Sequence, residues 1–355
     1  MKILETTLQQ INDLDKKSMD AARLRLNQLT KPLGSLGILE ELAERLAGIY
    51  GNPYPTIGDK VVILMAGDHG VVDEGVTAFP QEVTAQMVLN FISGGAGINV
   101  LARHAGARVV VVDVGIAQPL EHPILVQRSI RRGTWNLAQG PAMTREEAIA
   151  AVEAGIEVAT TEIARGATLL ATGDMGIGNT TPSSAILAVI SGYPVEKLVG
   201  RGTGINDERL AHKIQVIQSA IALNHPIPQD ALDVLAKVGG FEIGGLAGVV
   251  LAAAAHQIPV IIDGFISTTA ALIASHLHPK STQYMIASHV SKEPGHRILL
   301  DLLGLHPMLQ LNMRLGEGTG AALAMNIVEA ATKILREMAT FSDVGISEVN
   351  THSES

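Results

Sequence analysis

The chain has 355 residues, 47% of them hydrophobic and only 3% aromatic, with a formal net charge of −9. This composition can bury a sizeable core, which excludes global disorder, and an acidic chain with one Trp and four Tyr does not resemble a nucleic-acid-binding groove. The absence of Cys excludes disulfides, thiolate nucleophiles, iron–sulfur clusters and Cys-based zinc sites.

No targeting or membrane-spanning segment is predicted. The first 17 residues carry charges every few positions and lack the apolar stretch of a signal peptide. The longest uncharged apolar run, residues 243–255, is rich in Gly and Ala and too short to span a bilayer. We therefore expect a soluble, cytoplasmic protein that binds neither membrane nor nucleic acid.

Residues 1–50 are predicted to be helical. Leu and Ile recur at intervals of three or four in two stretches, residues 4–14 and 36–46. Between them, the KPLGSLG sequence at residues 31–37 cannot form a regular helix and predicts a loop.

Beyond about residue 60, short apolar runs rich in Val and Ile alternate with longer helical patterns. Such runs, bracketed by helices, are typical of parallel strands buried on both faces, so the predicted fold class is α/β. The five predicted strands cover residues 61–65, 109–112, 168–171, 259–262 and 284–287.

Each predicted strand is followed by an acidic residue or a histidine with small residues beside it. Ligands bind at the carboxyl ends of strands in open α/β sheets. Five such endings predict a polar cleft along one edge of the sheet, formed by Asp68 with His69, Asp113, Asp174, Asp263 and His289.

A first glycine loop, GDMGIGNTTP at residues 173–182, follows a predicted strand. We expect Thr181 to be the N-cap and Pro182 the first residue of the next helix, which leaves free N–H groups that suit a phosphate. The loop is neither a dinucleotide fingerprint nor a Walker motif. The structural alternative is a tight turn with an ordinary cap.

A second glycine loop, GRGTGIN at residues 200–206, includes Thr203 and ends at Asn206, a predicted N-cap. Lys213 follows about two helical turns later. A glycine-rich nest with a lysine fits a phosphate or carboxylate. A flexible connection with a solvated lysine is the alternative.

A third glycine loop, GEGTG at residues 316–320, precedes a helix predicted over about 321–338. It places Glu317 between glycines, which lets a ligand approach closely, so Glu317 is a candidate general base. Burial would raise its pKa and a helix N-terminus would lower it, leaving the net sign open.

The histidines do not predict a metal site. No HExxH motif occurs, and His276 and His278 would face different ways on a helix. Without a GxSxG elbow, a Ser-His-Asp triad is not predicted either. His69 and His289 could touch a substrate, although such histidines more often hydrogen-bond a loop. We expect no metal and no cofactor.

In combination, these segments resemble the nicotinate-nucleotide–dimethylbenzimidazole phosphoribosyltransferase family, from the first helix to the last. The motifs that carry the resemblance are KPLGSLG at 31–37, GDHGV at 67–71, DEGVT at 73–77, residues 173–182, KVGGFE at 237–242, DGF at 263–265 and RLGEG at 314–318.

The resemblance implies a Rossmann-like parallel sheet in a large domain, residues 56–304, and a small helical domain from residues 1–55 and 305–355. It also implies a homodimer whose subunits share each active site. The implied reaction converts nicotinate mononucleotide and 5,6-dimethylbenzimidazole into α-ribazole 5′-phosphate and nicotinate, with inversion at C1′, for the nucleotide loop of cobalamin.

This chemistry needs few catalytic groups. Nicotinate leaves from a pyridinium without a general acid, and no pyrophosphate leaves that would require Mg²⁺. The attacking azole must lose one proton, so one base suffices. The resemblance assigns this role to Glu317, and Asp174 matches an acidic residue that can stabilise positive charge at C1′.

The resemblance also implies the substrate contacts. Residues 79–87 would line an apolar pocket for the base, which the sequence does not specify further; core positions are the alternative for these residues. The implied base contacts are Phe79, Pro80 and Met87, and the implied nucleotide contacts are Gly176, Asn179, Thr180, Gly202, Lys213, Asp263, Gly264 and Ser291.

Three other interpretations fit less well. An NAD-dependent oxidoreductase predicts GxGxxG after the first strand, where this chain has GDHG. A pyrophosphate-dependent phosphoribosyltransferase predicts an acidic pair before a T-G-G/T-type loop, which is missing. A non-catalytic paralogue would be favoured had Glu317 been replaced.

Overall fold

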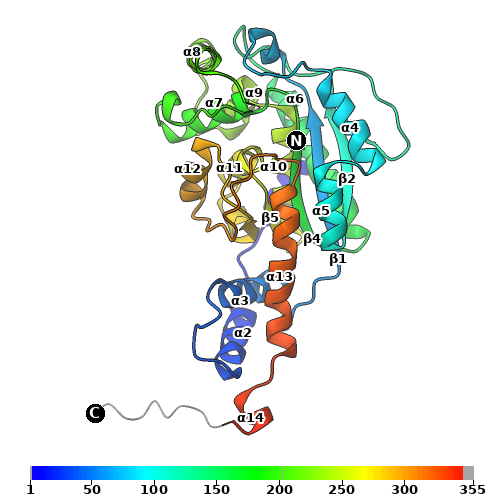
Figure 1. Ribbon diagram of the computed structural model, residues 1–355, viewed down its shortest axis with the longest axis vertical. Coiled ribbons are helices and arrows are strands. Elements are labelled where there is room, and N and C mark those ends of the chain that lie inside the picture. Colours follow the sequence, from blue (N-terminus) through cyan, green and yellow to red (C-terminus); the bar gives the residue numbers. More distant parts are fainter. Residues whose placement is uncertain (1, 203, 347–355) are drawn as a thin grey trace. The chain divides into compact units, whose positions relative to one another are not determined.

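The computed structural model describes residues 2–202 and 204–346. It contains a six-stranded parallel sheet (Figure 1). The order β3-β2-β1-β4-β5-β6 is that of dinucleotide-binding folds. The structure thus confirms the α/β class, the parallel sheet and all five predicted strands. The strands are β1 (Asp59–Gly67), β2 (Ala107–Gly115), β3 (Val126–Gln127), β4 (Ala167–Met175), β5 (Val260–Ile262) and β6 (Met285–Ala287).

Helices cover both faces of the sheet. Side chains alternate along β1, so that Met65 faces Gly245 of one helix layer while Val62, on the opposite face, meets Gly318 in a turn. Figure 1 shows α10 and α11 on one side of the sheet and α4 and α5 on the other. Helix α6 packs against α10 and also contacts β4. The five helices are α4 (Val83–Ser93), α5 (Gly97–Ala105), α6 (Arg145–Ala164), α10 (Phe241–Ala255) and α11 (Phe265–Leu277).

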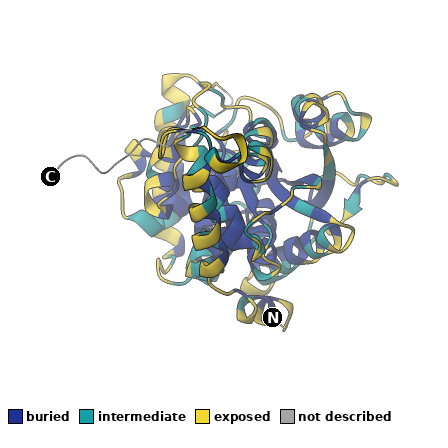
Figure 2. Cartoon of the chain, turned by 90° about the horizontal axis from the view of Figure 1, so that it is seen from below, coloured by how far each residue is buried: buried dark blue, intermediate teal, exposed yellow. Residues whose placement is uncertain are grey.

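The helix α10 lies in the interior. Every residue from Phe241 to Ala254 is buried, as expected of a helix that is apolar all round. It packs against α6, and the two backbones approach closely at glycines: a Cβ on Gly155 would lie 1.8 Å from the Gly245 carbonyl oxygen. In Figure 2 the buried residues concentrate in the sheet and the helices beside it.

The chain divides into two compact units, one from Met1–Asn12 and Gly58–Met325, the other from Asp13–Ile57 and Asn326–Ser355. The predicted domain borders lie at 55/56 and 304/305. The first unit holds the sheet, the helices named above and α1 (Lys2–Gln9), η1 (Gly70–Glu74), α7 (Thr180–Ser191), η2 (Val195–Lys197), α8 (Asp207–Asn224), α9 (Ala231–Val238), η3 (Pro279–Tyr284) and α12 (Pro294–Leu303).

The second unit is helical where it is described. It contains α2 (Lys16–Gln28), α3 (Ile38–Tyr50), α14 (Phe341–Val344) and most of α13 (Thr319–Glu337), which begins in the first unit. Arg25 joins the two chain ends within this unit, because its Nη2 donates to the Met338 carbonyl at 2.9 Å. The predicted loop at residues 31–37 separates α2 from α3.

Within the described residues, one stretch, Val83–Ala105, is long and apolar enough to cross a membrane by length and composition. In the structure it forms two helices, because Gly94 at φ +80° ends α4 and α5 begins only at Gly97. Both helices contact strands of the sheet. The stretch is therefore part of the layer that covers the sheet.

Candidate active site

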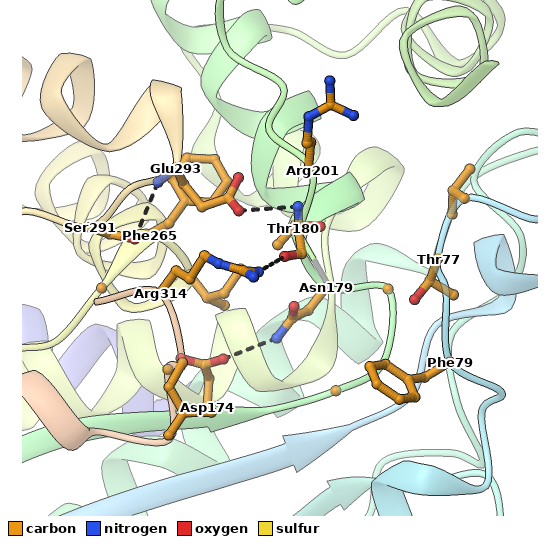
Figure 3. A pocket seen from close by; sticks show the side chains of 18 of the residues that line it. Thr77, Phe79, Asp174, Asn179, Thr180, Arg201, Phe265, Ser291, Glu293 and Arg314 are labelled. Atoms are coloured by element: carbon orange, nitrogen blue, oxygen red, sulfur yellow. Dashed lines mark hydrogen bonds between the residues drawn. The ribbon is translucent and has the colours of Figure 1, made fainter. Parts of the chain in front are cut away.

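A cavity of about 500 Å³ lies beyond the carboxyl ends of β4, β5 and β6. From β1 the strand order continues to β2 and β3 on one side, and from β4 it continues to β5 and β6 on the other. The cavity adjoins this switch point, which is where open α/β sheets bind ligands. Nine predicted site residues line it: Phe79, Asp174, Gly176, Asn179, Thr180, Gly202, Lys213, Gly264 and Ser291 (Figure 3). The lining does not include Pro80, Met87, Asp263 or Glu317.

Asp174 ends β4 and forms part of the cavity wall. Its side chain is only 6% exposed, and Oδ2 accepts a hydrogen bond from Asn179 Nδ2 at 3.0 Å. Burial raises its pKa well above the usual value, and the nearby carboxylates of Asp263 and Glu242 add to the rise. Among the described residues, Oδ1 has no hydrogen-bond partner.

The predicted start of the next helix is wrong by two residues. Asn179 is the N-cap and α7 begins at Thr180, so that Thr181 and Pro182 already lie in the first turn. Gly178, at φ +89°, turns the chain early, and the Thr181 N–H bonds back to the Gly178 carbonyl. The first turn of α7 nevertheless borders the cavity, as a phosphate site requires.

Lys213 is buried in the cavity wall. Only 1% exposed, it donates from Nζ to Thr180 Oγ1 at 2.6 Å, so the solvated alternative is wrong. Burial lowers its pKa to about 8. Asn206 caps α8 as predicted, accepting from the Arg209 N–H at 2.9 Å. Thr203, in the same loop, lies outside the described residues.

Three charged residues of the lining were not predicted as site residues: Arg201, Glu293 and Arg314. Arg314 donates to the Gly202 carbonyl at 2.8 Å, and Glu293 Oε1 accepts from the Gly202 N–H at 3.2 Å. Arg201 stands between two glycines in GRG, and Arg314 belongs to the RLGEG motif. These sequence signals could have identified both arginines as site residues.

Glu317 lies immediately behind the cavity lining, in the turn before α13. The residue is 6% exposed, and its Oε2 accepts from the Ile98 N–H at 3.2 Å. Burial raises its pKa and outweighs the lowering by that N–H, which decides the sign left open by the sequence. A Cβ on the neighbouring Gly316 would lie 3.3 Å from Asp174 Oδ2, so Asp174 and Glu317 adjoin the same turn.

Asp263 follows β5 and is not part of the cavity lining. The residue is 1% exposed, and its carboxylate accepts from the N–H groups of Gly318 and Ala321. Burial raises its pKa to about 7 despite these hydrogen bonds. Its neighbour Gly264 lines the cavity.

The two strand-end histidines differ in their surroundings. His289 lines the cavity, and its Nδ1 lies 3.0 Å from Ser288 Oγ. His69 is fully buried instead, with Nε2 2.9 Å from Glu242 Oε1. Only His289 is therefore placed to meet a ligand.

Ser291 is held by a buried histidine. Its N–H donates to His296 Nδ1 at 2.8 Å, while His296 Nε2 lies 2.9 Å from Thr268 Oγ1. Burial lowers the pKa of His296 to about 3, which keeps the ring neutral and able to accept this hydrogen bond.

The wall opposite Ser291 and Glu293 carries Thr77 and Phe79 (Figure 3). Phe79 is 50% exposed, Pro80 is exposed and Met87 is half-buried, so the alternative that all three are core residues is wrong. Other apolar side chains also line the cavity: Val76, Phe265, Ile266 and Leu315. Among the residues described, no group of three or more His, Cys, Asp or Glu could hold a metal ion.

Known proteins resemble this chain in sequence and in fold. A family model described as "Phosphoribosyltransferase" matches residues 11–346. Relatives from Desulforamulus reducens (58% identical, covering 98% of this chain and 100% of the relative) and Geotalea uraniireducens (57%, 98% and 99%) are both named nicotinate-nucleotide–dimethylbenzimidazole phosphoribosyltransferase. A crystal structure of that enzyme from Thermus thermophilus is 50% identical, with a TM-score of 0.90, and covers 94% of this chain and 100% of its own.

Proposed function

Because the chain belongs to the nicotinate-nucleotide–dimethylbenzimidazole phosphoribosyltransferase family of pentosyltransferases in cobalamin biosynthesis, we propose that its cavity binds both nicotinate mononucleotide and 5,6-dimethylbenzimidazole for reaction. Nicotinate mononucleotide supplies the phosphoribosyl group and 5,6-dimethylbenzimidazole, or a related base, attacks C1′ with inversion. Glu317 is the general base of this reaction.

The nucleotide phosphate binds at the first turn of α7. Lys213, Thr180 and the N–H groups of this turn lie together there, and Arg201 and Arg314 add positive charge to the same wall. Gly176, Asn179, Gly202, Gly264 and Ser291 complete the contacts to phosphate and ribose. A helix N-terminus with a buried lysine is suited to a phosphate monoester.

Asp174 stabilises positive charge at C1′. As the bond to the pyridinium nitrogen breaks, its electron pair goes to nicotinate and the ribose acquires oxocarbenium character. In its ionised form Asp174 places negative potential at this side of the cavity. Burial and the carboxylates of Asp263 and Glu242 raise its pKa and oppose that form, whereas the positive charge that develops at C1′ favours it. The attacking base rests against Phe79 and Leu315, with Pro80 and Met87 nearby in the same segment.

Glu317 takes the proton that the azole releases. The new bond forms between one ring nitrogen and C1′, and the N–H proton of the other nitrogen passes to the carboxylate. The Ile98 N–H holds Oε2, leaving Oε1 for this proton. A pKa raised by burial makes Glu317 a stronger base than an exposed glutamate.

One observation carries the proposal: a buried glutamate and a buried aspartate adjoin the same turn beside a cation-lined cavity. Its test incubates EDTA-treated protein with both substrates and measures α-ribazole 5′-phosphate and nicotinate by liquid chromatography with mass detection. We expect Glu317→Gln to slow turnover by about 10²- to 10⁴-fold with little change in affinity for nicotinate mononucleotide. Glu162→Gln is a matched control, since Glu162 is also buried but pairs with Arg108 and Arg165.

Two outcomes would contradict this proposal. A wild-type rate for Glu317→Gln would remove Glu317 as the base, and loss of nucleotide binding would make it a structural residue. No product from the wild type with dimethylbenzimidazole, adenine or phenol would overturn the transferase function itself and favour a binding protein.

We also propose, from the family resemblance alone, that the protein is a cytoplasmic homodimer whose subunits share each active site.

A further inference from the structure

Asp263 uses both carboxylate oxygens on the turn that carries Glu317. Oδ2 accepts from the Gly318 N–H at 3.1 Å and Oδ1 from the Ala321 N–H at 2.9 Å. These donors flank the start of α13, 55 and 58 residues further along the chain. The carboxylate thus caps the N-terminus of α13 and binds the backbone N–H of Gly318, the residue that follows Glu317.

The turn needs such an anchor, because its backbone is strained. Glu317 has φ +63°, in a region that non-glycine residues seldom adopt, and Gly316 and Gly318 on either side have φ +84° and +93°. A left-handed L-residue brings its Cβ too close to a carbonyl oxygen, which costs conformational energy. Surrounding interactions must supply that energy for the turn to persist.

The turn also lies directly on the sheet. A Cβ on Gly173 of β4 would lie 2.5 Å from the Glu317 carbonyl oxygen, and one on Gly318 would lie 2.8 Å from Val62 Cγ1. At Gly173 the backbone of the strand meets the backbone of the turn with no side chain between them, and at Gly318 the turn lies against the Val62 side chain. A small shift of the turn moves the Glu317 carboxylate relative to Asp174.

Asp263 itself is fixed by both neighbouring strand ends. Its N–H donates to Thr172 Oγ1 of β4 at 3.2 Å, and its carbonyl accepts from Ser288 Oγ, just after β6, at 3.0 Å. The anchor is rigid with respect to the sheet, and its carboxylate is buried away from the cavity lining.

We propose that Asp263 is a positioning residue that holds the Glu317 carboxylate in place for proton transfer, rather than a contact to the nucleotide. The inference rests on the proposed role of Glu317 as the base.

The test is Asp263→Asn, which keeps the size of the side chain but replaces one acceptor oxygen with an NH₂ group. We expect kcat to fall about 10- to 100-fold, because misplacing a catalytic group by 1 Å can cost 10²-fold. The dissociation constant of nicotinate mononucleotide, measured by calorimetry, stays within about 3-fold. Assays run at pH 8.5, where Asp263, with its pKa near 7, is ionised.

A double variant separates positioning from an independent role. If Asp263 acts through Glu317, Asp263→Asn slows the Glu317→Gln enzyme no further. Asp113→Asn is the matched control. Asp113 lies near the end of β2, is 1% exposed and accepts from two backbone N–H groups, those of Gly115 and Ile116, but it is not part of the cavity lining that the sequence predicted it to join. That variant should keep its kcat.

Hydrogen exchange gives a readout that does not depend on activity. Peptides covering residues 314–324 should exchange faster in Asp263→Asn and unchanged in Asp113→Asn. Should Asp263→Asn fail to fold, Thr319→Val weakens the same turn, because Thr319 Oγ1 donates to the Gly316 carbonyl at 2.8 Å, and it should produce the same changes in milder form.

Weakened nucleotide binding at unchanged kcat would make Asp263 a substrate contact and overturn the inference. Additive losses in the double variant, or unchanged exchange in the turn, would overturn it equally. A wild-type rate for Glu317→Gln would instead contradict the proposed role of Glu317 as the base. The hydrogen-exchange data would still decide whether Asp263 holds the turn.

Discussion

At the residue scale, burial sets the chemistry of the cavity. The charge of Lys213, the proposed phosphate ligand, depends on pH within the working range, because burial lowers its pKa from 10.5 to about 8. An exposed lysine would stay charged up to about pH 10. The arginines of the lining, Arg201 and Arg314, keep their charge at any pH that proteins tolerate.

This predicts a pH-dependent affinity for nicotinate mononucleotide. Below pH 8 Lys213 is protonated in the free enzyme, and binding a phosphate dianion raises its pKa further. Affinity should therefore be level up to about pH 8 and fall as pH rises beyond it, by at most about tenfold per unit. Calorimetric titrations from pH 6.5 to 9.5 measure this.

Replacement of the lysine supplies the control. Lys213→Met should weaken binding about 10- to 100-fold at pH 7, the value of one charge-assisted hydrogen bond, and abolish the fall above pH 8. The exposed Lys197→Met should behave like wild type. A persistent fall in the Lys213→Met variant would assign the titration to another group.

At the scale of elements, the contact between α6 and α10 depends on glycine. A Cβ on Gly248 would lie 2.0 Å from the Val152 carbonyl oxygen and 2.9 Å from the Ile156 nitrogen. Both contacts are to backbone, which cannot rotate aside. The tight packing brings α10 onto the sheet, where its first turn carries Glu242 beside His69.

Gly248→Ala should accordingly destabilise the protein. Alanine gains about 1 kcal/mol in helix propensity over glycine, yet overpacking of a tight core costs about 1–3 kcal/mol and a backbone clash lies at the upper end. We expect a lower urea midpoint, with a net loss of about 1–2 kcal/mol. Gly140→Ala is the control, because a Cβ there has nothing within 4 Å, and it should leave the midpoint unchanged.

At the scale of the whole molecule, the family resemblance predicts a dimer. Multi-angle light scattering should give a native mass of about twice the 37.3 kDa of one chain, stable on dilution to the assay concentration. A mass of one chain at that concentration, in an active preparation, would contradict shared active sites.

Local pattern was sufficient for most of the fold. The five longer strands are continuous apolar runs because both faces of the sheet are covered, and that signal is present in each segment by itself. The remaining strand, β3, has only two residues and lies at the sheet edge, so no apolar run in the sequence predicts it. The start of α7 was misplaced because a left-handed Gly178, which a sequence does not reveal, determines where the helix begins.

The sequence predicted only part of the candidate site. Glycines around Glu317, and the helix start near Thr180, marked positions where a ligand can approach backbone. Whether Lys213 was buried or solvated stayed open, because its environment comes from Thr180, 33 residues earlier, and Glu293, 80 residues later. Glu293 was missed for the same reason.

The amino-acid sequence by itself determined the parallel α/β architecture, the placement of carboxylates at strand ends and the glycine turns around them, since each is encoded over a few neighbouring residues. Asp174 and Asp263 look equivalent at that level, each ending a buried strand. Only the tertiary structure decided that one faces the cavity and the other the turn of Glu317. The direction of a buried carboxylate is set by the N–H groups that distant segments bring to it, and these meet only in the folded chain.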